Sequence, residues 1–227
     1  MCRMAGFSFN TPQNISNIIG FTKIMAQFGI ESPHNDGWGC VLSDGSKTLQ
    51  YKSIKPIYQD DLGLTKIGEE FKIGIIHARL ASKGLPKTTL QLHPFHKKGM
   101  YFAHNGTIKS AKRENVYQSD TYEYFENISE FKSLYELAKN IESFAKENEF
   151  TGMNFIIFDE IEETLYVCCL YKDTPKNREY FTLHYYEEDG NFIVYSEKYS
   201  PHFKPMENGE IFKIRDGKIT EKAMINL

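Results

Sequence analysis

Hydrophobic and polar positions follow two periods along this chain, one typical of helices and one typical of strands. Residues 14–28 carry apolar side chains at helical spacing and end at Gly29, so they predict a helix. Two further helices are predicted near 121–127 and 134–148. Apolar or alternating runs bounded by turn residues predict strands at 3–9, 37–42, 47–51, 71–77, 100–104, 153–158, 164–171, 181–186, 192–196, 210–214 and 218–220. Hairpins of antiparallel strands with helices grouped into layers indicate an α+β layered fold.

Length and composition favour one globular domain over residues 1–227. The chain has 227 residues, enough for a sizeable core, and 41% of them are hydrophobic and 14% aromatic. A net charge of -3, with lysines spread along the chain, gives no sign of a nucleic-acid partner. We therefore expect a protein that acts on small molecules or on other proteins.

Cysteine usage and the absence of targeting patterns predict a cytoplasmic protein. Four cysteines lie at positions 2, 40, 168 and 169 without a CxxC spacing, which favours a reducing compartment. A redox or metal role for Cys168 and Cys169 is the less favoured interpretation, because no His or Asp ligand is near them in sequence. We find no signal peptide and no apolar run of the ~20 residues that a membrane-spanning helix needs.

Cys2, directly after the initiator methionine, is the first residue with catalytic potential. Removal of Met1 would leave a cysteine that carries both a thiol and a free α-amine. An α-amine titrates near pH ~7.7–8.0 and a thiol near ~8.5, so the amine can take the thiol proton without a catalytic histidine. The ordinary interpretation of a lone cysteine, a small buried hydrophobe, remains open at this point.

Polar clusters at the ends of predicted strands offer the other groups that such a nucleophile needs. Arg79 follows an apolar strand, and its planar guanidinium suits either a substrate carboxylate or a structural acid. Asn105 and Gly106 can point an amide N–H and a backbone N–H at one oxyanion, or form an ordinary turn. Asp120, beside Ser119, can hold a cationic group or cap a helix. A further cluster, 34–39, is expected to be a tight turn, and His93 is expected to shape a loop.

The order of these motifs resembles the class II glutamine amidotransferases of the N-terminal nucleophile hydrolase superfamily, in their stand-alone form. The resemblance rests on Cys2, on Asp-Gly-x-Gly at 36–39, on His-x-Arg at 77–79, on His-Asn-Gly at 104–106 and on Ser-Asp-Thr at 119–121. It implies a four-layer αββα sandwich of two mainly antiparallel sheets between helical layers. One departure is Leu80, which stands where several relatives have a large aromatic residue.

The resemblance also implies a role for each of these residues. Cys2 would be the nucleophile, Asn105 and Gly106 the oxyanion hole, and Asp120 the group that holds the substrate ammonium. Arg79 would bind the substrate carboxylate, and Ser82 would assist it. The implied reaction is hydrolysis of the glutamine side-chain amide to glutamate and ammonia through a γ-glutamyl thioester, with no metal and no cofactor.

Three alternatives stay open at the level of sequence. The protein could cleave γ-glutamyl peptides or metabolites, because the predicted clamp contacts only the γ-glutamyl head. It could be a non-catalytic regulatory subunit of the same fold, although it keeps every motif residue. It could be a general amidase with the same nucleophile. The expected small-molecule partner is glutamine or a γ-glutamyl compound, and either a separate ammonia-accepting synthase docks on this chain or the enzyme acts alone; no nucleic acid and no membrane are expected.

Overall fold

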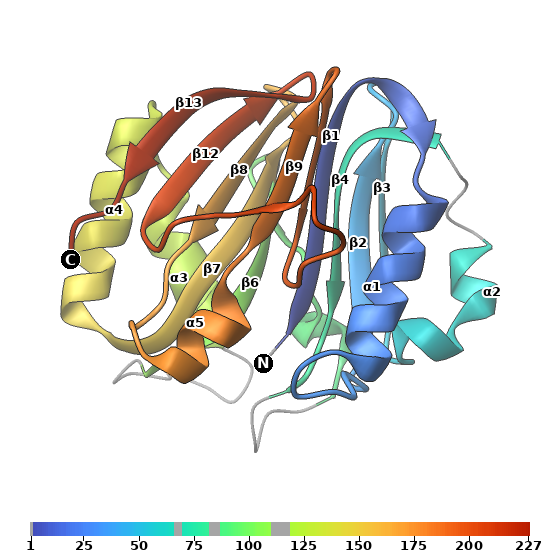
Figure 1. The fold of residues 1–227 in the computed structure, drawn as a ribbon, viewed down its shortest axis with the longest axis horizontal. Helices are drawn as coiled ribbons and strands as arrows, with labels where there is room; N and C mark the ends of the chain where they lie inside the picture. Colours follow the sequence, from blue (N-terminus) through green and yellow to red (C-terminus); the bar gives the residue numbers. More distant parts are fainter. Residues whose placement is uncertain (1, 66–69, 82–86, 110–118) are drawn as a thin grey trace.

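A computed structural model describes residues 2–65, 70–81, 87–109 and 119–227, in which two antiparallel sheets face each other (Figure 1). Predicted Ser82 lies outside the described residues. The first sheet has the strand order β11 (Lys204–Pro205), β9 (His184–Glu188), β10 (Asn191–Tyr195), β1 (Arg3–Asn14), β4 (Glu70–Ala78), β2 (Trp38–Ser43) and β3 (Thr48–Ser53). The second has the order β13 (Lys218–Met224), β12 (Glu210–Arg215), β8 (Thr164–Cys169), β7 (Glu149–Asp159), β6 (Met100–Lys109) and β5 (Phe95–Lys97).

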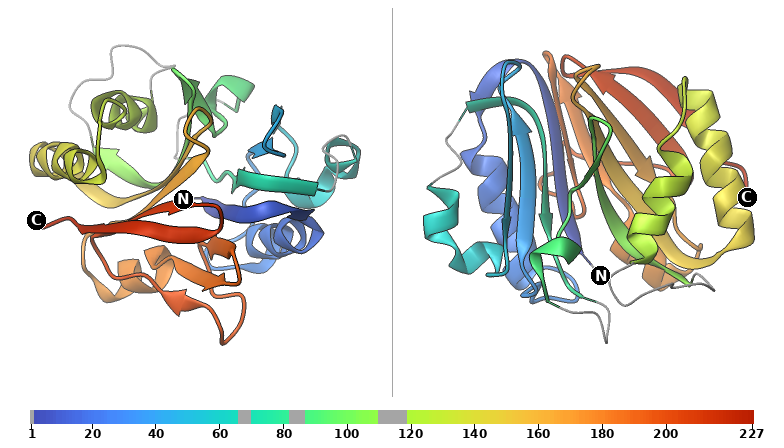
Figure 2. Two further views of the ribbon diagram at one scale, coloured as in Figure 1. Left: turned by 90° about the horizontal axis from the view of Figure 1, so that it is seen from above. Right: turned by 180° about the vertical axis from the view of Figure 1, so that it is seen from behind.

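Helices cover the outer faces of both sheets and complete four layers (Figures 1 and 2). Helix α1 (Ser16–Phe28) packs on the first sheet, and α3 (Asp120–Ile128) and α4 (Leu134–Glu147) pack on the second. Two shorter helices, α2 (Asp61–Leu64) and α5 (Pro175–Phe181), lie at the periphery. This arrangement confirms the α+β class and the αββα sandwich that the sequence predicts.

Each pair of adjacent layers encloses its own hydrophobic core. Met4, Ile156 and Val194 belong to the core between the two sheets. Leu137 of α4 and Phe155 of β7 belong to the core under the second helical layer, and the core under α1 is built in the same way. Strands with one face in each core are apolar on both faces, which explains the nearly continuous hydrophobic runs of β1, β4 and β7.

The helix boundaries follow recognisable capping residues. Ser119 caps α3 by accepting a hydrogen bond from the Tyr122 N–H at 3.2 Å, and Ser133 does the same for α4 through Glu136 at 3.2 Å. Helix α1 ends at Phe28, before Gly29, as the sequence predicts. The N-cap of α3 is therefore Ser119 and not Asp120, which lies in the first turn of the helix.

The structure differs from several predicted elements: β1 runs to Asn14, past the predicted end at 9, and β5 and α2 were not predicted. The predicted strand 181–186 is wrong in its first residues, because Phe181 ends helix α5 and strand β9 begins only at His184. Thr174 caps α5 and Pro175 follows it, a start signal that outweighs the β propensity of the aromatic residues behind it. Strand β6 runs through Lys109, well past the predicted end at 104, so Asn105 and Gly106 lie within a strand and not in a turn.

Strand pairing gathers the predicted site residues at one end of the sandwich. Arg3 pairs with Ala78 of β4, and Trp38 of β2 pairs with the same residue from the other side. Cys2, Arg79 and Gly37 therefore meet where these strands begin or end, and β1 also contacts β6 of the second sheet. Within the described segments, no helix is both long and apolar enough to span a lipid bilayer.

Candidate active site

Cys2 is buried where the two sheets meet, with only 8% of its surface exposed. Its backbone nitrogen donates a hydrogen bond to Asn105 Oδ1 at 2.8 Å, which joins the start of β1 to strand β6. The Sγ atom lies 3.9 Å from the carbonyl oxygen of Leu80, toward which the thiol can direct its hydrogen. Both functional groups of Cys2 are thus held by the structure.

Asn105 presents an unused hydrogen-bond donor next to Cys2. Its Oδ1 is occupied by the Cys2 nitrogen, while its Nδ2 is buried and has no hydrogen-bond partner. Buried donors without partners are rare in folded proteins, and they are found where a site awaits a ligand. Gly106 follows Asn105 in a position that only glycine can occupy, because a Cβ there would overlap the carbonyl of Gly152. An amide N–H therefore stands beside Cys2.

Arg79 is held by backbone contacts with the turn that precedes β2. The Arg79 N–H donates to Gly37 O at 2.9 Å, and Asp36 N–H donates to Arg79 O at 3.1 Å. The Asp36 side chain adds two more contacts to the segment after β4. Its Oδ2 accepts a hydrogen bond from the Ala81 N–H at 2.8 Å, and its Oδ1 pairs with Lys87. Residues 34–37 form the predicted turn, Trp38 and Gly39 already belong to β2, and the turn also positions the segment that carries Arg79.

Burial and the surrounding donors act in opposite directions on the Asp36 carboxyl. Burial raises its pKa, but contacts with Lys87 and Ala81 outweigh burial and leave the pKa below its usual value. The carboxylate is therefore ionised at neutral pH. An ionised Asp36 can hold the backbone after β4 in one conformation.

Asp120 lies at the start of α3, and strand β6 fixes its carboxylate. Oδ2 accepts a hydrogen bond from the Ile108 N–H at 2.9 Å, and Oδ1 accepts from the Thr121 N–H at 3.0 Å. Each carboxylate oxygen can accept more than one hydrogen bond, so Asp120 retains capacity for a further cation.

One small cavity brings these groups together. It measures about 40 Å³, and its wall is formed by Cys2, Arg79, Leu80, Gln91, His93, His104, Gly106, Ser119, Asp120 and Thr121. A cation, an anion, a thiol and a backbone donor thus surround one space. A larger cavity of about 710 Å³ near the end of α4 includes none of the predicted site residues, so we place the site at the smaller one.

Three buried histidines support the wall of this cavity. Burial lowers the pKa of His77 to about 3 and that of His104 to about 4, and it also lowers the pKa of His93, so all three are neutral at pH 7. His77 Nε2 lies 3.2 Å from the His104 carbonyl and 2.9 Å from His93 Nδ1. Because a carbonyl only accepts, His77 carries its hydrogen on Nε2, which leaves the His93 hydrogen on Nε2.

Sequence reasoning identified most of this wall but missed part of it. Gln91 and Thr121 line the cavity, and neither received a role from the sequence. Gln91 had no signal beyond its closeness to His93. His93, expected only to shape a loop, also lines the cavity.

Comparison with known proteins gives a match over most of the chain. Residues 1–149 match the family model described as glutamine amidotransferases class-II. No match was found among curated protein sequences.

Solved structures with the same fold share little sequence with this chain. Glutamine phosphoribosylpyrophosphate amidotransferase from B. subtilis is 18% identical with a TM-score of 0.69, and the match covers 100% of this chain and 50% of that one. The chain thus spans about half the length of that protein. A glutamine aminotransferase class-II domain protein from Silicibacter pomeroyi is 15% identical with a TM-score of 0.62, and the match covers 99% of both chains.

A predicted glutamine amidotransferase from Pseudomonas aeruginosa is also similar in fold. It is 18% identical with a TM-score of 0.52, and the match covers 97% of this chain and 100% of that one. At these identities the likeness concerns the fold alone.

Proposed function

The chain belongs to the class II glutamine amidotransferases, and from this premise we propose that it hydrolyses the side-chain amide of glutamine with Cys2 as the nucleophile. The observation that carries the proposal is the hydrogen bond from the Cys2 nitrogen to Asn105 Oδ1 beside the unpartnered Asn105 Nδ2. After removal of Met1, that nitrogen is an α-amine. It can donate one hydrogen to Asn105 and keep its lone pair for the thiol proton.

The proposed reaction has two steps, formation of a thioester and its hydrolysis, and the second step regenerates the Cys2 thiol. The Cys2 sulfur attacks the amide carbon, its proton passes to the α-amine, and Asn105 Nδ2 and the Gly106 N–H stabilise the oxyanion. The carbon–nitrogen bond then breaks, and ammonia leaves with the proton from the α-amine. Water, deprotonated by the same amine, attacks the γ-glutamyl thioester and releases glutamate and the free thiol.

The amino-acid head of the substrate would be held by opposite charges. Arg79 would bind the α-carboxylate and Asp120 the α-ammonium, and both side chains line the cavity that contains Cys2. Ser82 would assist Arg79. The cavity between these groups measures about 40 Å³, room for a few water molecules.

Hydrolysis of γ-glutamyl peptides or metabolites is the second candidate function. Arg79 and Asp120 would bind only the α-carboxylate and α-ammonium of the substrate, and neither would contact the leaving group. Both candidates treat residues 1–227 as one glutaminase domain. Both also place the protein in the cytoplasm, where its four free thiols, all buried, stay reduced. Under the first candidate, a separate synthase would accept the ammonia.

The proposal is tested by intact mass with and without a diazo-ketone analogue of glutamine. We expect loss of Met1 and one adduct that maps to Cys2. Turnover of glutamine is then compared with that of a γ-glutamyl dipeptide, and of an amide without the α-amino acid group, which a general amidase would accept. A retained Met1, or a processed protein that never reacts, would reject the proposal in favour of a non-catalytic subunit.

A further inference from the structure

Arg3 is fully buried directly after the proposed nucleophile. None of its surface is exposed, although a buried guanidinium is costly unless it is paired. Its Nε lies 2.7 Å from Glu197 Oε1, and its Nη2 donates to the Ile30 carbonyl at 2.5 Å, while Nη1 has no hydrogen-bond partner. The single carboxylate that it contacts is partly exposed to solvent, so the positive charge is only partly compensated.

Tyr180 connects this charge to the backbone of Cys2. The Arg3 guanidinium lies 4.1 Å from the centre of the Tyr180 ring, in a cation–π contact. The Tyr180 hydroxyl lies 3.4 Å from the Cys2 carbonyl oxygen. Cys2 faces the cavity with Arg79 and Asp120, whereas Arg3 contacts Tyr180 and Glu197. Arg3 and Tyr180 thus contact the Cys2 backbone without lining the cavity themselves.

His34 shares the hydrogen of this hydroxyl. Burial, then the charge of Arg3, lowers the pKa of His34 to about 4, so the ring is neutral at pH 7. Its Nδ1 lies 3.3 Å from the Ala26 carbonyl, which only accepts, so Nδ1 carries the hydrogen. Nε2, 3.4 Å from the Tyr180 hydroxyl, is then an acceptor. Tyr180 has one hydrogen for two acceptors, His34 Nε2 and the Cys2 carbonyl.

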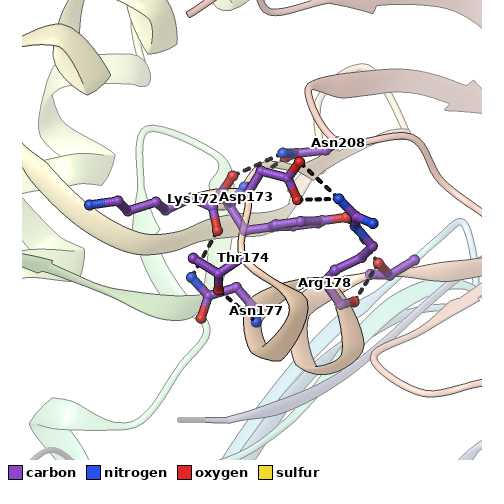
Figure 3. A network of polar contacts seen from close by, with 8 residues as sticks. Lys172, Asp173, Thr174, Asn177, Arg178 and Asn208 are labelled. Carbon is purple, nitrogen blue, oxygen red and sulfur yellow. Dashed lines mark hydrogen bonds and ion pairs between the residues drawn. The ribbon is translucent and has the colours of Figure 1, made fainter.

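The helix that carries Tyr180 is braced by a polar network at its start (Figure 3). Thr174 Oγ1 accepts from the Asn177 N–H at 3.2 Å, and Asn177 Nδ2 donates to the Lys172 carbonyl at 2.8 Å. Arg178 pairs with both oxygens of Asp173 at 2.9 Å. At the other end of the helix, Asn154 Nδ2 of β7 donates to Phe181 O at 2.5 Å. Tyr180 is thus held between two fixed points.

We propose that Arg3 and Tyr180 are positioning residues for the nucleophile: the Tyr180 hydroxyl orients the Cys2 carbonyl, and the Arg3 charge disfavours protonation of the Cys2 amine. This inference rests on the proposed function. An amine must be neutral to act as a base, and a nearby cation makes its protonated form less stable. Glu197 limits the effect, because its negative charge opposes that of Arg3.

Other ionisable groups around Cys2 do not replace this effect. Arg79 and Asp120, which line the cavity, carry opposite charges, and His77, His93, His104 and His34 are neutral at pH 7. Glu31, on the side of Tyr180, pairs with Lys176 at 2.9 Å. Arg3 is therefore the buried cation whose charge acts on the protonation of the Cys2 amine.

The test uses variants that change the net charge near the Cys2 amine in opposite directions. Arg3→Met removes the cation, and we expect the acid limb of the pH profile of kcat/KM to move up by about 0.5–1 pH unit. Glu197→Gln removes the counter-charge and should move the same limb down. Arg3→Lys should restore the wild-type profile. Both Arg3→Met and Glu197→Gln break one ion pair, so a merely structural role would move both profiles in one direction.

Tyr180→Phe separates orientation from charge. It removes the hydrogen bond to Cys2 while keeping the ring under Arg3, so kcat should fall about 10-fold with the acid limb unmoved. Tyr135→Phe is the matched control, because Tyr135 is 70% exposed. A wild-type kcat in Tyr180→Phe would reject the orienting role.

A second readout, the pH dependence of Cys2 alkylation by iodoacetamide, does not require turnover. Unmoved profiles in Glu197→Gln would overturn the role of Arg3, even if Arg3→Met failed to fold. Failure of the proposed function would look different: the wild-type protein would turn over neither glutamine nor a γ-glutamyl dipeptide, and Cys2 would not be alkylated as an N-terminal residue.

Discussion

Asn105 combines two tasks on one side chain, and a single substitution can separate them. Its Oδ1 accepts from the Cys2 nitrogen at 2.8 Å, and its Nδ2 is the free donor of the proposed oxyanion hole. Asn105→Asp keeps the acceptor but replaces the donor with an oxygen that repels an oxyanion. We expect kcat for glutamine hydrolysis to fall about 10²–10³-fold, measured as glutamate release.

The control for this substitution is Asn127→Asp, which makes the same chemical change on the exposed side of α3 and should leave kcat unchanged. Alkylation of Cys2 should survive in Asn105→Asp, because the amine and the thiol remain in place. Wild-type turnover in Asn105→Asp would show that the oxyanion is stabilised elsewhere.

Asp120 is predicted to act on binding rather than on chemistry. Its carboxylate is fixed by the Ile108 and Thr121 N–H groups, and these leave it able to accept from an ammonium. Asp120→Asn removes the charge, so KM for glutamine should rise about 10–100-fold while kcat changes little. The control is glutaric acid monoamide, which has no α-amine. If its KM rose as much as that of glutamine, Asp120 would not be the ammonium partner.

At the residue scale, the sequence predicted groups that are neighbours in the chain and missed contacts between residues far apart in the chain. Asn105 and Gly106 are adjacent, so two letters of sequence predicted a shared site; the structure bonds Asn105 to Cys2 and places Gly106 in the wall of the same cavity. Tyr180 lies 178 positions from Cys2, and nothing in its neighbourhood indicates that its hydroxyl reaches the Cys2 carbonyl. Arg3 was visible beside Cys2, but its full burial depends on partners from α5 and from the segment after β10.

At the scale of elements, the turn before β2 and the end of β4 act as one unit. The Asp36 carboxylate accepts from the Ala81 N–H at 2.8 Å, and so fixes the backbone that carries Arg79. Asp36→Ala should destabilise the fold by about 1–2 kcal/mol, because the partly buried Ala81 N–H loses its acceptor. It should also raise KM for glutamine several-fold, since Arg79 is less well placed. Urea unfolding and steady-state kinetics measure the two effects.

Lys87→Met provides the comparison for Asp36→Ala. The Lys87 side chain is 63% exposed, and an ion pair of this kind contributes about 0–1 kcal/mol. We therefore expect a KM within twofold of wild type. Equal losses in both variants would mean that the ion pair, and not the backbone contact, holds the Arg79 segment.

Element boundaries were predictable where local signals agreed and not where the tertiary structure decided them. Helix α1 ends at Phe28, as the glycine after it predicts. Strand β6 continues to Lys109 because its neighbour β7 offers backbone partners along the whole length, which a single sequence does not reveal. Helix α5 was missed although Thr174 and Pro175 gave a start signal, because the aromatic residues that follow resemble a strand.

At the scale of the whole molecule, the layered fold buries uncharged histidines close to the candidate site. His34, His77, His93 and His104 are all buried, and burial holds their pKa values well below 6.5. In the unfolded chain these rings bind protons as the pH falls below about 6.5, whereas in the folded protein they do not. Below pH 6.5 the unfolded state is therefore favoured progressively, by about 1.4 kcal/mol per pH unit for each histidine.

His34 allows this effect to be measured for one group. Its pKa is lowered to about 4, so it contributes full stability above about pH 6.5 and loses about 3 kcal/mol between pH 6.5 and 4. His34→Gln removes the titrating group, and the slope of unfolding free energy against pH should become shallower by about 1.4 kcal/mol per unit in this window. Urea unfolding at several pH values measures the slope. An unchanged slope in His34→Gln would mean that this ring accepts a proton without unfolding, and that the Tyr180 hydroxyl can lose its His34 acceptor in the native state.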